Sequence, residues 1–382
     1  MNGTREATLR GSFIWSRPTN PMTVLRAITT LPLVAAMLCS VAQAEILVGV
    51  AGPMSGQYAA FGNEVKTGAE AAVAAINAAG GINGEQLAVV ASDDACDTKR
   101  AAEVAREFVA KDVRVVIGHF CSGASLAAAY IYADAGIVML SPAASNPALT
   151  EKSLWNVFRL TGRDDAQAEL AVETVKATPD GLAAIITDGT PVGTALANRF
   201  VTRLSQTPTI TIKPGQTDLE AVAAAITEKT YSHVYLATAA TDAVRLALAL
   251  RNGGYNGVLL ASDAVVTEGF GNKAGVAADG LRATFPADPT LNVNASATIS
   301  AMLTGGKAAD GATLPAYAAL QAFAAAAKAT SVNDGKAMAR WLHGNGVSTV
   351  LGSVTFDAKG DLTVQPFVWY QFASGNFRLE QN

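Results

Sequence analysis

Small polar residues follow two short apolar runs, and their types and spacing suit the binding of an anion. Residues 113–118 lead into His-Phe-Cys-Ser-Gly-Ala-Ser (119–125), and residues 137–140 lead into Ser-Pro-Ala-Ala-Ser (141–145). Both runs are rich in β-branched residues and mostly apolar on both faces, which is typical of buried parallel strands with a helix between them. Ligands of such sheets bind beyond the carboxyl ends of the strands, where backbone N–H groups and hydroxyls suit a carboxylate. The pattern therefore predicts a site for a small anion or zwitterion.

Catalysis is the competing interpretation of these residues, and the surrounding motifs argue against it. Ser122 and His119 are close in sequence, but no G-x-S-x-G turn surrounds the serine and no third residue can be assigned. Asp93, Asp94 and Asp97 could supply paired carboxylates for acid–base chemistry or for a cation, yet Asp94 and Asp97 more often cap a helix, here one predicted to begin near residue 98. The sequence has no Walker A and no G-x-G-x-x-G motif. We therefore expect a binding protein, with no catalytic residue and no cofactor.

Composition and charge narrow the class of partner. Of the 382 residues, 50% are hydrophobic and 16% are charged, which excludes a disordered or fibrous chain and allows two or three domains. The net charge is −4 and no basic run occurs, so nucleic acid is not expected as a partner. The three histidines are scattered and no C-x-x-C motif occurs, so no metal site is expected.

Residues 1–44 have the pattern of an export signal. Arg26 precedes an apolar run over residues 27–38, and small residues then lead to Ala-Gln-Ala (42–44). A charged region, an apolar region and an A-x-A site in this order predict export with cleavage after Ala44.

Alternatives to this signal concern its start and its fate. Met22 is a second candidate start, which would make residues 1–21 an upstream extension. A membrane anchor is disfavoured because the apolar run is shorter than the ~20 residues of a spanning helix. A lipoprotein acylated at Cys39 is disfavoured by the bulky Leu38 before it.

Cleavage of the signal leaves two cysteines, Cys96 and Cys121, in an oxidising compartment. A disulfide between them would close a loop of about 25 residues and stabilise the fold by roughly 3 kcal/mol. Two buried free thiols are the alternative.

Strand and helix patterns alternate along the rest of the chain in two series. The first has predicted strands at 46–50, 87–90, 113–118, 137–140 and 156–160, with helices at 61–77 and 98–111. The second has predicted helices at 167–176, 194–204, 219–227 and 243–252, with strands at 182–186, 209–212, 233–236 and 258–261. Two α/β series predict two doubly wound lobes with a cleft between them, and with crossings near residues 162–164 and 285–288. One large sheet is the alternative, but it would need more strands than twisted sheets usually hold.

Several motifs occur in one order along the chain and carry a family resemblance that covers nearly all of it after the signal. They are residues 45–56, 93–97 (Asp-Asp-Ala-Cys-Asp), 116–122 (Val-Ile-Gly-His-Phe-Cys-Ser), 141–145, 317–320 (Tyr-Ala-Ala-Leu) and 360–362 (Gly-Asp-Leu). In these motifs the chain resembles the periplasmic leucine/isoleucine/valine-binding proteins, which are substrate-binding proteins of ABC transporters. The resemblance implies a periplasmic location and a type I periplasmic binding fold. It also implies that Cys96 and Cys121 form a disulfide.

The same resemblance implies where the boundaries of the lobes lie and which membrane protein the chain binds. Three crossovers would join the lobes, the third near residues 355–362. Lobe 1 would then comprise residues 45–163 and 286–357, and lobe 2 residues 164–285 and 358–382. The lobes would close on the ligand as a hinge. The closed monomer would dock on an ABC permease in the inner membrane, or, as an alternative, present its ligand to a membrane receptor as a sensor.

The polar ends of the ligand site carry over residue by residue from the resemblance. Ser122, the backbone amide of Ala143 and Ser145 match the carboxylate end, whereas each serine alone could be an ordinary helix N-cap. Asp263 falls where the family places a glutamate that pairs the ligand ammonium, but it is one methylene shorter. An Asx-turn or a helix cap is the alternative role of Asp263.

The apolar wall departs from the family. Phe61 keeps an aromatic position, and Phe120 is bulkier than the leucine often found there. Val192 and Ala239 replace tyrosines in lobe 2, and Ala312 replaces an aromatic residue in lobe 1. The pocket is therefore reshaped, and we expect an aliphatic or otherwise hydrophobic α-amino acid. The second choice is an aromatic or branched carboxylate without an amine.

Overall fold

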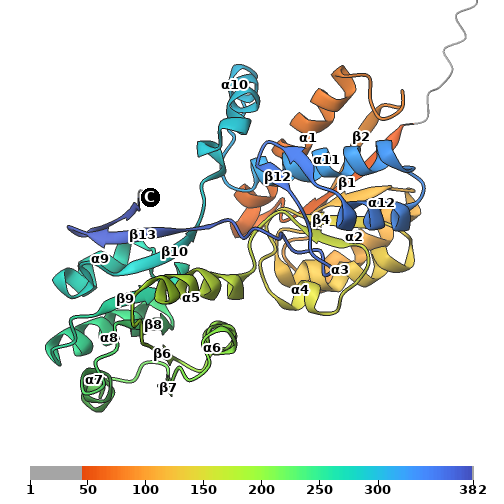
Figure 1. The fold of residues 1–382 in the computed structure, drawn as a ribbon. Coiled ribbons are helices and arrows are strands. Elements are labelled where there is room, and N and C mark those ends of the chain that lie inside the picture. The colour runs from red at the N-terminus through yellow and green to blue at the C-terminus, as the bar shows by residue number, and fades with distance from the viewer. Residues whose placement is uncertain (1–44, 381–382) are drawn as a thin grey trace, which may run out of the picture. The chain divides into compact units, whose positions relative to one another are not determined.

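The computed structural model describes residues 45–380 (Figure 1). The predicted export signal lies outside the described residues, together with its candidate starts and Cys39. None of the described helices is both long enough and apolar enough to span a membrane.

Within residues 45–380, the first sheet has five parallel strands in the order β2-β1-β3-β4-β5. The strands are β1 (Ile46–Gly52), β2 (Leu87–Asp93), β3 (Val115–Ile117), β4 (Val138–Ser141) and β5 (Val157–Arg159). The helices of this lobe are α1 (Ala59–Ala78), α2 (Thr98–Ala110), α3 (Ser122–Asp134), α4 (Ala148–Glu151), α10 (Ser296–Thr304), α11 (Thr313–Ala329) and α12 (Gly335–Gly344). A short hairpin, β11 (Val347–Thr349) and β12 (Gly352–Val354), joins them.

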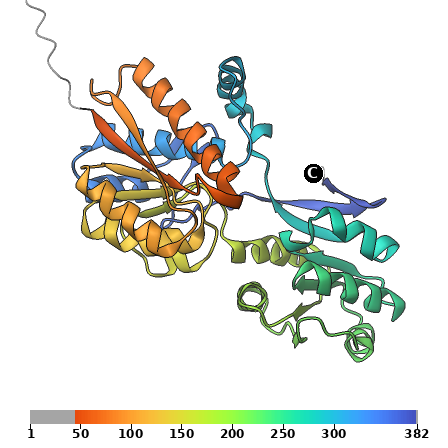
Figure 2. The same ribbon diagram turned by 180° about the vertical axis from the view of Figure 1, so that it is seen from behind.

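Apolar side chains cover both faces of this sheet, which is why its strands read as continuous apolar runs. Val48 and Val50 pack in one core with residues of α1 and α11, whereas Val116 and Met139 pack in another with residues of α2 and α3. Figures 1 and 2 show the late helix α11, in blue, beside the early helix α1, in orange. The chain therefore returns to the first sheet after it has built the second.

The second sheet has seven strands in the described part of the chain, in the order β14-β13-β10-β9-β8-β6-β7. They are β6 (Ala183–Thr187), β7 (Thr209–Thr211), β8 (His233–Ala237), β9 (Val258–Ala261), β10 (Arg282–Pro286), β13 (Phe367–Ala373) and β14 (Asn376–Leu379). Strands β6 to β10 are parallel, and β13 is antiparallel to β10. Its helices are α5 (Gln167–Ala177), α6 (Pro191–Arg203), α7 (Glu220–Thr227), α8 (Ala240–Asn252) and α9 (Glu268–Ala274).

Two separate sheets confirm the predicted pair of doubly wound lobes and exclude the single large sheet. Residues of α5 and α6 pack on one face of the second sheet, and residues of α7, α8 and α9 on the other. The predicted strands and helices up to residue 261 are present, with ends that differ by a few residues. Helix α6, for example, begins at Pro191 rather than at residue 194, because the Thr190 side chain accepts a hydrogen bond from the backbone N–H of Gly193 (3.1 Å).

The chain crosses between the sheets after β5, after β10 and before β13. The third crossing differs from the prediction, which placed it near residues 355–362 and assigned residues 358–362 to lobe 2. Leu362 lies in the core of the first sheet, and the backbone N–H of Arg159 donates to the carbonyl of Gly360 (3.0 Å). Strand β13 begins only at Phe367, so the crossing covers residues 363–366.

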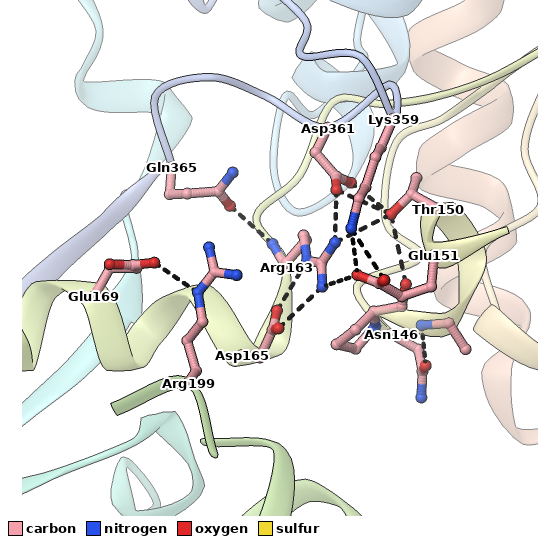
Figure 3. Close-up of polar contacts among 12 residues, drawn as sticks. Asn146, Thr150, Glu151, Arg163, Asp165, Glu169, Arg199, Lys359, Asp361 and Gln365 are labelled. Carbon is pink, nitrogen blue, oxygen red and sulfur yellow. Dashed lines mark hydrogen bonds and ion pairs between the residues drawn. The ribbon is translucent and has the colours of Figure 1, made fainter. Parts of the chain in front are cut away.

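A buried ion cluster ties the first and third crossings together (Figure 3). The Arg163 guanidinium donates to both carboxylate oxygens of Asp165 (2.9 Å each) and to Asp361 Oδ2 (2.8 Å). Arg159 Nε also lies 2.6 Å from Asp361 Oδ1. The backbone N–H of Arg163 donates to the side chain of Gln365 (3.0 Å). Hydrogen bonds and ion pairs of Arg163 therefore hold the first crossing against the third crossing and the residues just before it.

Candidate functional site

A cavity of about 900 Å³ lies against the carboxyl ends of the first sheet and the crossings. Phe61, Phe120, Ala143 and Ala312, four of the residues that the sequence singled out, line it. The rings of Phe61 and Phe120 stack, with centroids 5.0 Å apart and planes inclined by 12°. Residues of β10 and of the third crossing line it as well. The structure therefore brings the predicted aromatic contacts of lobe 1 together in one large, mostly apolar space.

Ser122, the first residue of α3, and Ser145, in the loop after β4, follow neighbouring strands, because β3 pairs with β4 in parallel. The Ser122 hydroxyl accepts a hydrogen bond from the backbone N–H of Asn146, the residue after Ser145 (3.3 Å). Neither serine is a helix N-cap, because Cys121 precedes α3 and Pro147 precedes α4. The structure therefore contradicts the alternative that these serines are helix N-caps.

A disulfide between Cys96 and Cys121 fixes the start of α3, and it confirms the predicted pairing. The two Cα atoms are 5.5 Å apart, and the bond joins the loop after β2 to the residue before Ser122. The backbone amides at this helix start are thereby held next to the loop that carries Asp94 and Asp97.

His119, Asp94 and Asp97, which could have suggested catalysis, bind other residues of the fold. His119 is buried, with Nδ1 2.6 Å from Asp94 Oδ2 and Nε2 3.0 Å from the hydroxyl of Tyr132. Burial and the charge of Asp94 raise the pKa of Tyr132. Asp97 caps α2 by accepting from the backbone N–H groups of Lys99 and Arg100. Both ring nitrogens of His119 are thus engaged away from Ser122.

Asp263 follows β9 and begins a short 3₁₀ turn, η3 (Asp263–Val265). Its backbone N–H donates to Gln167 Oε1 (2.9 Å), and Gln167 Nε2 donates to Asp263 Oδ1 (3.1 Å). The hydroxyl of Thr284 donates to the same Gln167 oxygen (2.6 Å). Burial raises the pKa of Asp263, the hydrogen bond from Gln167 lowers it, and the charge of Asp164 raises it further. A chain of hydrogen bonds from β10 therefore fixes the direction of this carboxylate.

Two residues of this region were missed by the sequence reasoning. Gln167 is the first residue of α5, and the sequence analysis treated it only as part of a helix. Its contact with Asp263 was not predictable from local pattern, because the two residues are 96 positions apart in sequence. Asp164 lies in the 3₁₀ turn η2 (Asp164–Ala166) directly after the first crossing. The acidic pair at positions 164–165, placed at a predicted crossing, was the signal that could have drawn attention to it.

Val192 and Ala239 do not line the cavity that the aromatic residues of lobe 1 line. Val192 lies in the first turn of α6 and is 54% exposed. Ala239 is the N-cap of α8, and its backbone N–H donates to Asp188 Oδ2 (2.8 Å). Neither residue, nor Asp263, lines the 900 Å³ cavity. The candidate site thus consists of a lobe 1 part and a lobe 2 part.

Comparisons with known proteins agree with this two-lobed architecture. Residues 45–376 match the family described as periplasmic binding protein. The Leu/Ile/Val-binding protein homolog 2 of Brucella abortus is 36% identical over 342 residues, which cover 87% of this chain and 91% of the relative.

Solved structures share the fold over almost the whole described chain. The ABC transporter substrate-binding protein from Desulfitobacterium hafniense in complex with Leu is 26% identical, with a TM-score of 0.69 over 88% of this chain and 100% of that chain. The branched-chain amino acid transporter substrate-binding protein LivJ from Streptococcus pneumoniae in complex with isoleucine is 25% identical, with a TM-score of 0.61 over 87% of this chain and 98% of that chain.

Proposed function

Because this chain belongs to the family of periplasmic binding proteins, as its motifs predicted, we propose that it is the solute-binding component of an ABC importer and holds a hydrophobic α-amino acid between its lobes. The observation that carries the proposal is that hydrogen-bond donors follow strands of one sheet, whereas a carboxylate follows a strand of the other. Hydroxyls and backbone amides follow β3 and β4 of the first sheet, and the Asp263 carboxylate follows β9 of the second.

The carboxylate of the ligand would lie at the first sheet. Ser122 supplies a hydroxyl, and the loop after β4 supplies the backbone amide of Ala143. A charged acceptor forms hydrogen bonds about twice as strong as a neutral one, and the start of α3 adds its dipole. These groups favour an anion over an uncharged end group.

The ammonium of the ligand would meet Asp263 of the second lobe. Gln167 orients this carboxylate through two hydrogen bonds, 2.9 and 3.1 Å long, so little side-chain freedom would be lost on binding. A ligand that binds one lobe with each end favours the closed arrangement of lobes, because only that arrangement satisfies both ends.

The side chain of the ligand would enter the cavity beside Phe61 and Phe120. Of the residues that line this cavity, three are acidic, namely Glu64, Asp288 and Asp310, and none is basic. An anionic side chain is therefore disfavoured there, and the apolar wall favours a hydrophobic one. The Leu and Ile complexes of the similar proteins from Desulfitobacterium hafniense and Streptococcus pneumoniae agree with this class of ligand.

Export and assembly follow from the same proposal. The signal over residues 1–44 would direct the chain to the periplasm and be cleaved after Ala44. The closed monomer would then deliver its ligand to an inner-membrane ABC permease. No step of this role requires catalysis or a cofactor.

A thermal-shift screen of protein from Glu45 onward against the standard amino acids and their deaminated acids tests the proposal. A ligand at a hundredfold excess over its Kd should stabilise the protein by about 2.7 kcal/mol, which gives a clear rise in Tm. A rise with hydrophobic amino acids alone supports the proposal. A rise with none of the amino acids would overturn it.

A carboxylate without an amine is the second candidate class of ligand. The observation in its favour is that Gln167 already hydrogen-bonds Asp263. Such a bond would let the carboxylate serve a structural purpose only. A rise in Tm with deaminated acids, and with no amino acid, would select this candidate.

A further inference from the structure

The hydroxyl of Ser141 connects the loop after β3 with the loop after β4. Ser141 is the last residue of β4 and is 0% exposed. Its Oγ lies 3.0 Å from the carbonyl oxygen of His119 and 3.0 Å from the backbone nitrogen of Ala144. Because a backbone N–H only donates, the Ser141 oxygen accepts from Ala144, and its single proton is donated to His119. The hydroxyl is therefore a directed bridge between the two loops.

The residue that accepts this proton is itself held in place. Nδ1 of the His119 ring lies 2.6 Å from Asp94 Oδ2, and Nε2 lies 3.0 Å from the hydroxyl of Tyr132. All three side chains are 0% exposed. Asp94 belongs to the loop after β2 and Tyr132 to α3, so contacts with both elements fix the position of His119. The Ser141 bridge thus starts from a fixed point of the first lobe.

The bridge takes up one N–H group of the loop after β4 and leaves its two neighbours free. The N–H of Ala144 donates to Ser141. Within residues 45–380, the N–H groups of Ala143 and Ser145 have no hydrogen-bond partner. Free N–H groups near the start of a helix suit an anion, and in the proposed function they lie at the carboxylate end of the site.

The carbonyl groups of the same loop are engaged from another side. The buried Arg159 guanidinium donates to the carbonyl of Ala144 (2.9 Å). The backbone N–H of Asp164 donates to the carbonyl of Ser145 (3.0 Å). These contacts hold the carbonyl side of the loop, whereas Ser141 holds its N–H side. The conformation of the loop therefore depends on a side chain that lies beneath it.

We propose that Ser141 is a positioning residue for the ligand carboxylate. It holds the N–H of Ala144, and the loop thereby keeps the N–H groups of Ala143 and Ser145 available as donors. The inference rests on the proposed function, because it concerns the end of the site assigned to the carboxylate. Ala144 is 1% exposed, so loss of the Ser141 hydroxyl would leave a buried N–H without an acceptor. Such a group is costly, and a loop that rearranges to satisfy it no longer offers preorganised donors.

Isothermal titration of protein from Glu45 onward tests this role. The ligands are L-leucine, L-isoleucine and L-phenylalanine, together with 4-methylpentanoate, which has a carboxylate and no amine. Ser141→Ala should raise the Kd of each ligand that the wild type binds by roughly 10-fold or more. Ser141→Thr keeps the hydroxyl, so its Kd values should be close to those of wild type.

Ser125→Ala is the matched control, because Ser125 is a second serine that is 0% exposed beside the same carbonyl. Its hydroxyl lies 3.2 Å from the His119 oxygen and 3.1 Å from that of Cys121, and among residues 45–380 it has no bond to the loop after β4. Both alanine variants should lower Tm, since each removes a buried hydrogen bond. Only Ser141→Ala should lose affinity for the ligand.

The outcomes separate the role of Ser141 from the proposed function. Wild-type affinity in Ser141→Ala would overturn the role while the proposed function stands. Equal losses of affinity in Ser141→Ala and Ser125→Ala, or in Ser141→Ala and Ser141→Thr, would assign the effect to core packing and overturn the role as well. If the wild type binds 4-methylpentanoate and none of the amino acids, the proposed ligand is wrong, and the same variants decide the role of Ser141 with that acid. If the wild type binds none of the four ligands, the proposed function fails and this inference fails with it.

Discussion

Gln167 holds Asp263 with both ends of its side-chain amide. The amide nitrogen donates to the carboxylate (3.1 Å), and the amide oxygen accepts from the backbone N–H of the same aspartate (2.9 Å). The first residue of α5 thereby fixes the first residue of η3. Asp263 is shorter than the glutamate expected at this position, and an oriented short carboxylate restricts where a ligand ammonium can lie.

Asp263→Asn should weaken the binding of an α-amino acid by about 1.5–3 kcal/mol, because the ammonium loses a charged acceptor. The amide keeps the size of the side chain, so the fold should be retained. The binding of a deaminated acid should be unchanged or stronger. Isothermal titration with both ligand classes measures the effect.

The control for this variant is Asp279→Asn, an exposed aspartate in the same lobe. It should bind like wild type. An Asp263→Asn protein that binds amino acids as tightly as wild type would show that Asp263 is a structural residue of its turn.

Ser122→Ala should weaken ligand binding by roughly 1–3 kcal/mol, because the ligand carboxylate loses a hydroxyl donor in a closed cleft. Ser331→Ala, which changes an exposed serine of the same lobe away from α3 and the loop after β4, is the matched control. Titration calorimetry of the two variants decides between a ligand contact and a loop contact to Asn146. If Ser122→Ala binds the ligand as tightly as wild type, Ser122 does not contact the ligand, and its only role is the hydrogen bond with Asn146.

The affinity for an amino acid should fall as the pH is lowered. Burial raises the pKa of Asp263 above the ordinary value of 3.8, so in the free protein this group takes up a proton at a higher pH than ordinary aspartates. An ammonium favours the ionised carboxylate, so binding requires proton loss. Affinity is therefore complete above the raised pKa and is lost as the pH falls through it.

Titration calorimetry from neutral to mildly acidic pH measures this dependence. Asp263→Asn should flatten it, since the titrating carboxylate is removed. A wild-type affinity that stays constant, or that rises on acidification, would contradict the assignment of Asp263 to the ammonium.

Ala312→Phe should reduce the space beside Phe61 and Phe120, because Ala312 lines the same cavity. Binding of ligands with large side chains should weaken relative to valine. Thermal shifts with phenylalanine, leucine and valine give the order of preference for wild type and variant. An unchanged order would place the ligand side chain elsewhere.

Asp361→Asn should lower the free energy of unfolding by about 3–5 kcal/mol, because it leaves the buried Arg159 without its counter-charge and removes one of the partners of Arg163. Asp361 is 2% exposed and contacts both guanidinium groups, at 2.6 and 2.8 Å. Lys359→Met is the control, because the exposed pair of Lys359 with Glu151 should contribute only about 0–1 kcal/mol. Urea unfolding of the two variants measures the difference, and equal losses would contradict the assigned strength of the cluster.

Part of the site was predictable because it depends on the order of local patterns. Parallel strands that follow one another place their carboxyl ends at one edge, so the loops after β3 and β4 had to lie together. Phe120 and Ala143, which follow these two strands, accordingly line one cavity, although Ser122 and Ser145 do not line it. Val192, Ala239 and Asp263 of the second lobe also lie outside it, and no local pattern determines which residues of one lobe meet those of the other.

The sequence by itself determined the strands and helices up to residue 261 and the two α/β series, since each strand buried on both faces must be a run of apolar residues. The tertiary structure alone decided the third crossing and the neighbours of the binding groups. Asp361 meets Arg163 across 198 positions, and Gln167 meets Asp263 across 96. Pairing between polar side chains so distant in sequence leaves no periodic pattern, because it is fixed by the packing of the two sheets.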